Sequence, residues 1–140
     1  LDQDYVNEWK VNSGASARVN FHGVLNPIDS WQFAKGAWIG LTLLESTPAF
    51  IEAVPSKLYE YLYSGLAAIS TPLPRCIEII EKSKGGVIAH DVAQAARVMN
   101  EWATNPLPLI EMRSAAKNWA HKDLGIKEHY ATFIAAVKAL

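Results

Sequence analysis

The chain has 140 residues, half of them hydrophobic, and a formal net charge of −1. This is enough apolar material for one domain with its own core, which excludes a disordered tail. The basic residues are scattered, which excludes the clustered positive charge that holds a nucleic acid backbone. We therefore predict no nucleic acid partner.

The cysteine count and the hydropathy of the chain exclude further classes of protein. The single cysteine, Cys76, excludes a disulfide framework, and no Cys/His spacing predicts a metal site. Without a disulfide framework, we expect a reducing, cytoplasmic compartment. No apolar run reaches the roughly 18 residues of a membrane span, so we expect a soluble domain. Because the chain begins with Leu1 and enters a polar, helix-like stretch from Asp2 to Lys10, we expect a piece of a longer polypeptide.

Strand and helix patterns alternate through the middle of the chain. We predict strands at Val19–Phe21, Trp38–Leu44, Leu66–Ser70 and Gly86–Ala89, and helices at Pro27–Ala34, Ser56–Ser64 and Pro74–Ser83. The helices are bounded by prolines and glycines, and the strands after the first are nearly continuous apolar runs. This alternation predicts a parallel sheet with helices on its faces.

After residue 90 the pattern is helical throughout. Apolar side chains recur at the spacing of amphipathic helices in three groups: Val92, Ala95, Ala96, Met99, Trp102 and Ala103; Leu109, Met112, Ala116 and Trp119; and Ile126, Tyr130, Phe133, Ile134 and Val137. We predict a single Rossmann-like α/β domain over residues 1–140, with its α/β core at 19–90 and C-terminal helices at 91–140.

Two loops are candidate binding segments, because ligands of open parallel sheets lie beyond the carboxyl ends of the strands. The first runs from Gly23 to Pro27, and the second from Glu45 to Val54. The second is longer than the usual connection of about 2 to 6 residues, and long loops of this kind are often functional. It is the better candidate.

The helix after the second loop suits an anion. Pro55 has no N–H and a backbone angle suited to a first helical turn, so we expect the amides of Ser56, Lys57 and Leu58 to be unpaired. Such amides bind anions at the positive end of the helix dipole. Lys57 adds a positive charge suited to a phosphate oxygen.

Two glutamates flank this anion site. Glu60, one turn further on, is suited to accept hydrogen bonds from two vicinal hydroxyls, as acidic residues do with the ribose of dinucleotides. Glu52, in the loop, would lie on the far side of the phosphates, beside a second polyol such as a sugar. The alternatives remain open: Lys57 and Glu60 also fit an exposed ion pair worth about 0.2 to 0.5 kcal/mol, and Glu52 a solvated loop residue.

An ordered set of motifs then resembles a known family. The runs are VNFHGV at 19–24, WIGLTLL at 38–44 and PSKLYEYLYSGL at 55–66, continued by ISTP at 69–72, EII at 78–80 and GGVI at 85–88. Together they are similar to the carboxy-terminal half of retaining glycosyltransferases of family four. Members have the GT-B fold, in which two Rossmann-like domains enclose the active site.

The resemblance implies a role for each matching residue. Glu60 would bind the ribose of a nucleotide-sugar donor. Glu52 would be the first acid of the family's paired-glutamate motif, a catalytic residue that faces the donor sugar. The segment Val54, Ser56 and Lys57 would contact the diphosphate. The nucleobase would meet backbone groups of Gly23, Val24 and Leu25.

The family also implies what surrounds this chain. Transfer retains anomeric configuration and usually needs no metal, so no cofactor is expected. The Arg and Lys that clamp the diphosphate, and the acceptor-binding domain, would precede Leu1, so this chain alone should be inactive. Peripheral membrane association of the longer protein stays open. Two alternatives remain: a non-catalytic Rossmann-like binding or interaction module with a decayed pocket, and a sugar-phosphate isomerase.

Overall fold

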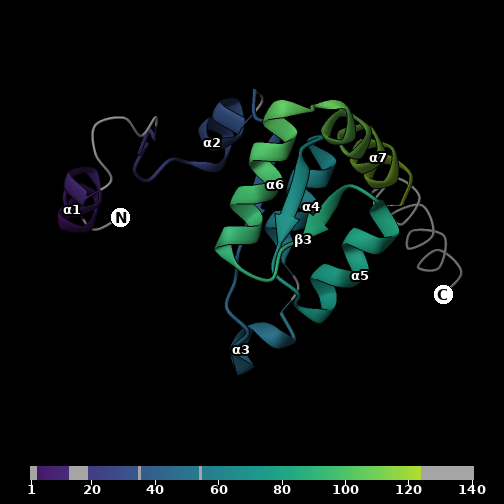
Figure 1. Cartoon of the computed structure of the whole chain (residues 1–140), viewed down its shortest axis with the longest axis horizontal. Helices are drawn as coiled ribbons and strands as arrows, with labels where there is room; N and C mark the ends of the chain where they lie inside the picture. Colours follow the sequence, from purple (N-terminus) through teal and green to yellow (C-terminus); the bar gives the residue numbers. More distant parts are fainter. Residues whose placement is uncertain (1–2, 13–18, 35, 54, 124–140) are drawn as a thin grey trace, which may run out of the picture. The chain divides into compact units, whose positions relative to one another are not determined.

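The computed structural model describes residues 3–12, 19–34, 36–53 and 55–123. The chain divides into two compact units, residues 1–36 and residues 37–140 (Figure 1). No helix within the described ranges is long and apolar enough to cross a membrane.

The first unit contains helices α1 (Gln3–Asn12) and α2 (Pro27–Ala34). The helix predicted at Pro27–Ala34 is confirmed. Asn26 fixes its start, because its Oδ1 accepts a hydrogen bond from the Asp29 amide at 3.0 Å. The strand predicted at Val19–Phe21 is wrong: these residues form neither strand nor helix. A strand exists only by pairing, and the described strands pair with one another.

The second unit is built on a parallel sheet of β1 (Ile39–Thr42), β2 (Ala67–Ser70) and β3 (Gly86–Ile88), in the order β1-β2-β3. Ile39 lies opposite Ala67, and Ala68 opposite Gly86. Three of the four predicted strands are therefore confirmed, each slightly shorter than predicted. All residues of β2 are buried, as expected for a central strand covered on both faces.

Helices cover both faces of the sheet (Figure 1). They are α4 (Ser56–Tyr63), α5 (Pro74–Ser83), α6 (Val92–Thr104) and α7 (Leu107–Asp123). The short helix α3 (Pro48–Ile51) lies in the loop after β1 and has no buried residue. One buried cluster joins Ala68 to apolar residues of α4, α5 and α7, and another joins Ala67 and Ile69 to residues of α6 and α7. The helix predicted over Ile126–Val137 lies outside the described residues.

Helix α6 buries a narrower stripe than its sequence predicts. Ala95 and Trp102 are buried, but Val92, Ala96 and Ala103 are exposed. Val98, which lies outside the predicted stripe, packs with Met99 against the buried cluster on this side of the sheet. Only one side of the helix therefore meets the sheet.

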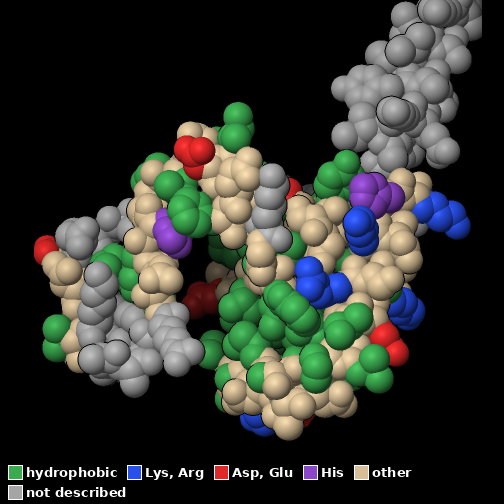
Figure 2. Space-filling view, turned by 90° about the horizontal axis from the view of Figure 1, so that it is seen from above, with side chains coloured by type: hydrophobic (Ala, Val, Ile, Leu, Met, Phe, Trp, Pro, Cys, Tyr) green, Lys and Arg blue, Asp and Glu red, His purple; other side chains and the backbone are tan. Residues whose placement is uncertain are grey.

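Helix α7 is tied to the segments that enter β1 and β2. Arg113 donates from Nε to the Gly65 carbonyl oxygen at 2.9 Å, and its guanidinium lies 4.7 Å from the centre of the Trp38 ring. Figure 2, which looks onto the end of the unit where α6 joins α7, shows hydrophobic side chains gathered there. Exposed apolar residues of these segments include Trp38, Leu107 and Ile110.

The close approach of β3 to β2 depends on Gly86, which has no side chain. A Cβ placed on Gly86 would overlap the carbonyl oxygen of Ala68 and crowd Ile80. We expect Gly86→Ala to lower the free energy of unfolding by about 1–3 kcal/mol, because the backbone must shift to admit the methyl group. Urea unfolding measures this change. The control is Gly36→Ala, where nothing lies within 4 Å, and a change below about 0.5 kcal/mol is expected.

Ionisation of Tyr61 makes the free energy of unfolding depend on pH in alkaline solution. Its ring lies over Gly40, its hydroxyl donates to the Leu41 carbonyl oxygen at 3.3 Å, and burial, with a smaller contribution from Glu60, raises the pKa of Tyr61. As the pH rises through 10.0, its unperturbed value, the unfolded chain loses this proton first, so the free energy of unfolding falls. Tyr61→Phe should flatten that fall in unfolding measurements from pH 9 to about 11. Tyr63→Phe, at a half-exposed position of the same helix, should keep it.

Candidate functional site

A hollow of about 390 Å³ lies at the carboxyl edge of the sheet, and we call it the strand-end hollow. Its lining residues come from the loops after the three strands: Leu43–Ser46, Thr71–Leu73 and His90–Val92. Because parallel strands end at the same edge, the three loops converge, as the general position of ligands in such sheets requires. This is the part of the second unit best placed to hold a small molecule.

Hydrogen bonds between neighbouring loops shape the strand-end hollow. Thr71 donates from Oγ1 to the Leu44 carbonyl oxygen at 2.7 Å, which ties the loop after β2 to the loop after β1. The Ala89 amide donates to the Ser70 carbonyl oxygen at 2.8 Å and extends the pairing of β3 with β2. The walls are thus held by the same pairing that builds the sheet.

The third wall is the start of α6. Asp91 is its N-cap, and its Oδ1 accepts from the Gln94 amide at 2.6 Å. Gln94 returns the contact, since its side-chain oxygen accepts from the His90 amide at 2.8 Å. This reciprocal arrangement resembles a capping box and leaves little room for an external anion at the first turn.

The strand-end hollow is acidic. Glu45 and Asp91 contribute carboxylates, Ser46 and Thr71 contribute hydroxyls, and His90 contributes an imidazole. No lysine or arginine occurs among its described lining residues. The side chains of Glu45, Ser46 and His90 are exposed and have no hydrogen-bond partner in the described part of the chain. They are available to a ligand.

Among the residues singled out from sequence, Ser56, Lys57, Glu60 and Glu52 belong to the second unit, and none of these four lines the strand-end hollow. Ser56 and Lys57 open α4, directly after the long loop, which contains the unpredicted helix α3. The helix starts at Ser56, with Pro55 as its N-cap. The expectation of three unpaired amides is wrong for Leu58, whose amide donates to the Pro55 carbonyl oxygen at 2.9 Å. The Ser56 and Lys57 amides have no acceptor among the described residues.

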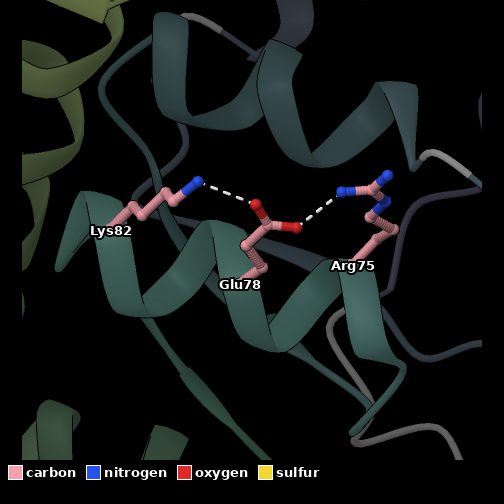
Figure 3. Close-up of polar contacts among 3 residues, drawn as sticks. All are labelled: Arg75, Glu78 and Lys82. Atoms are coloured by element: carbon pink, nitrogen blue, oxygen red, sulfur yellow. Dashed lines mark hydrogen bonds and ion pairs between the residues drawn. The ribbon is translucent and has the colours of Figure 1, made fainter.

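Lys57 and Glu60 are exposed and do not pair with each other. The ion pairs formed within the described ranges lie on α5, where Glu78 accepts from Arg75 at 2.6 Å and from Lys82 at 2.7 Å (Figure 3). The exposed ion pair that the spacing of Lys57 and Glu60 allows is therefore absent from the structure. Both side chains keep their charges free for a ligand.

Glu52 ends α3 as its C-cap and is exposed. Its charge acts on Arg75: the hydrogen bond to Glu78 is the main cause of the raised pKa of Arg75, and Glu52 adds a smaller contribution. Val54 lies outside the described residues.

The residues predicted to meet a nucleobase belong to the first unit. Gly23 adopts a left-handed φ of 69°, and Val24 is exposed. Leu25 is half-buried in the same coil before α2. Their contact with a nucleobase stays a prediction.

The second candidate loop, Glu45–Val54, begins with Glu45 and Ser46, which line the strand-end hollow. Thr71, His90 and Asp91 were missed, although each follows a predicted strand within a few positions. The carboxyl-end rule would have selected these three residues if it had been applied to every strand and not to two loops. The signal was present in the order of the elements.

Within the described ranges, no three His, Cys, Asp or Glu side chains gather where they could hold a metal ion. Comparison of the chain with protein-family models, with curated proteins and with solved structures finds no match.

Proposed function

We propose that this chain is the nucleotide-sugar donor-binding half of a retaining glycosyltransferase of the GT-B type, which transfers a sugar to a glycan or glycoconjugate. The observation that carries the proposal is the start of α4, where two unpaired amides, Lys57 and Glu60 are all free of protein partners among the described residues. Its place after a strand of a parallel α/β sheet supports the proposal.

The chemistry follows from these groups. The Ser56 and Lys57 amides, with the positive end of the α4 dipole behind them, attract the diphosphate. The Lys57 ammonium adds a full positive charge beside it. Glu60 is three residues further along the helix, so it lies within about 5–6 Å of Lys57 between Cβ atoms. That spacing suits a ribose joined to the phosphate.

Other groups complete the proposed site. Glu52, as the first acid of the paired-glutamate motif, faces the donor sugar. An acceptor-binding domain of the same polypeptide and the Arg and Lys that clamp the diphosphate belong to the longer protein in this proposal, so transfer needs that longer protein. Positive charge and helix amides stabilise the negative charge that develops on the leaving diphosphate. Cytoplasmic location, with peripheral membrane association of the longer protein, belongs to the same proposal.

A non-catalytic interaction module is the second candidate. One observation favours it: Leu41, in the edge strand β1, is 44% exposed although it is a large apolar residue. Unpaired strand edges with apolar side chains are surfaces on which other chains pair. Such a module binds no nucleotide, which separates the two candidates.

Calorimetric titration with uridine and guanosine diphosphates tests the ribose assignment. We expect Glu60→Gln to raise Kd about 10- to 100-fold, because a charged hydrogen-bond acceptor is worth about 1.5–3 kcal/mol. Glu81→Gln is the control, because Glu81 is an exposed helical glutamate on α5, and it should bind as the wild type does. Equal affinities of wild type and Glu60→Gln would refute this role of Glu60.

Lys57→Met tests the phosphate assignment separately. We expect it to weaken binding of nucleoside diphosphates and to reduce the dependence of Kd on salt, since the lost contact is electrostatic. Binding of the matching nucleosides should not change. Loss of nucleoside affinity in Lys57→Met would place Lys57 at the base or the ribose and contradict the assignment.

A further inference from the structure

We propose that the outer face of helix α7 binds the surface of a membrane that contains anionic phospholipids. The α7 outer face consists of Leu107, Ile110, Ser114, Lys117 and His121. This inference rests on the membrane association included in the proposed function, and it does not depend on donor binding. It names the surface through which that association takes place.

The α7 outer face is exposed along its whole length. Its residues recur every three or four positions, so they lie on one side of the helix. Leu107 and Ile110 are 59% and 48% exposed although both are apolar, and Lys117 and His121 are exposed as well. The opposite side of α7 is buried in the two apolar clusters of the unit. The outer face is therefore the side of the helix that is left for a partner.

Two half-exposed aromatic rings lie beside this face. Trp38 is 48% exposed, and the Arg113 guanidinium lies 4.7 Å from the centre of its ring. Tyr63 is 51% exposed, and its ring centre lies 5.0 Å from that of His121. Figure 2 shows hydrophobic side chains at this end of the unit with Lys, Arg and His side chains beside them. Trp and Tyr are the side chains enriched where a membrane meets water.

The charges of α7 favour an anionic partner. The helix carries three cations, Arg113, Lys117 and Lys122, against two acids, Glu111 and Asp123. The ion pairs within the described ranges form on α5, so Lys117 and Lys122 have no carboxylate partner there. Unpaired cations of this kind are attracted to the negative potential of anionic lipids.

The order of side chains along the α7 outer face favours a membrane over an acidic polypeptide. The face is apolar at Leu107 and Ile110 and cationic from Lys117 onwards. At a bilayer surface, apolar side chains enter the boundary of the acyl chains while cations stay with the headgroups. Negative charge on a polypeptide accounts for the cationic part alone.

Membrane contact at this face leaves the proposed donor site open. The ring of His121 contacts Tyr63, which is the last residue of α4, whereas the proposed phosphate site is at Ser56, the first. Because an α-helix rises 1.5 Å per residue, these two ends of α4 are about 10 Å apart. We therefore expect the chain to bind a membrane and a nucleotide independently.

The test is co-sedimentation of the chain with vesicles of phosphatidylcholine, alone and mixed with an equal part of phosphatidylglycerol. We expect binding to the vesicles that contain phosphatidylglycerol, and weaker binding as sodium chloride is raised, because salt screens exposed charges. Vesicles of phosphatidylcholine alone should bind much less. Uridine diphosphate should leave the vesicle affinity unchanged.

Lys117→Gln and Lys57→Gln form a matched pair, since each removes one exposed lysine. Lys117→Gln should weaken vesicle binding about fivefold, which is the contribution of one lysine near an anionic bilayer, and should leave uridine diphosphate binding unchanged. Lys57→Gln should do the reverse. Ile110→Gln should weaken vesicle binding at high salt as well as at low salt, because its contribution is hydrophobic.

The outcomes separate this inference from the donor function. If phosphatidylglycerol vesicles do not bind the chain, or bind wild type and Lys117→Gln equally, the membrane surface is refuted, and nucleotide binding decides the donor function by itself. If vesicles bind as expected but no nucleoside diphosphate binds, the membrane surface stands and the donor function fails. Soluble polyglutamate that binds through Lys117 while vesicles do not would assign an acidic polypeptide to this face and overturn the membrane assignment.

Discussion

Parallel pairing of β2 with a strand on each side is the constraint on which the second unit depends. All four residues of β2 are buried, and two of them, Ala67 and Ala68, face opposite helical layers. The absence of a side chain at Gly86 lets β3 approach the Ala68 carbonyl. Because both pairings are parallel, β1, β2 and β3 end at the same edge of the sheet, and the loops that follow them begin there.

Two groups of residues with opposite charge lie in the segments that follow the strands. The strand-end hollow carries Glu45 and Asp91 and lacks described cations, whereas the start of α4 carries Lys57 and two unpaired amides. Asp91 strengthens this separation of charge, since it caps α6 with its own carboxylate and removes a second anion site.

Local signals predicted most elements of the second unit and α2 of the first. Proline and glycine bounded α2, α4 and α5 closely, because these residues act through their own backbone angles. The strand at Val19–Phe21 failed, because pairing with another strand is not a local property. The exposure of Val92 and Ala103 was missed for a related reason: periodicity shows which residues share a helix face but not how wide a face the sheet covers.

The sequence by itself determined the alternation of strands and helices, the parallel sheet and the residue types at the start of α4. Only the tertiary structure decided which of these groups are free. Spacing allows Lys57 and Glu60 to pair, but the ion pairs of the described residues form on α5. The sequence also predicted an unpaired Leu58 amide, but in the structure this amide donates a hydrogen bond to the Pro55 carbonyl oxygen. Convergence of Glu45, Thr71 and Asp91 likewise required the sheet, because residues so far apart in sequence meet only when parallel strands bring their carboxyl ends together.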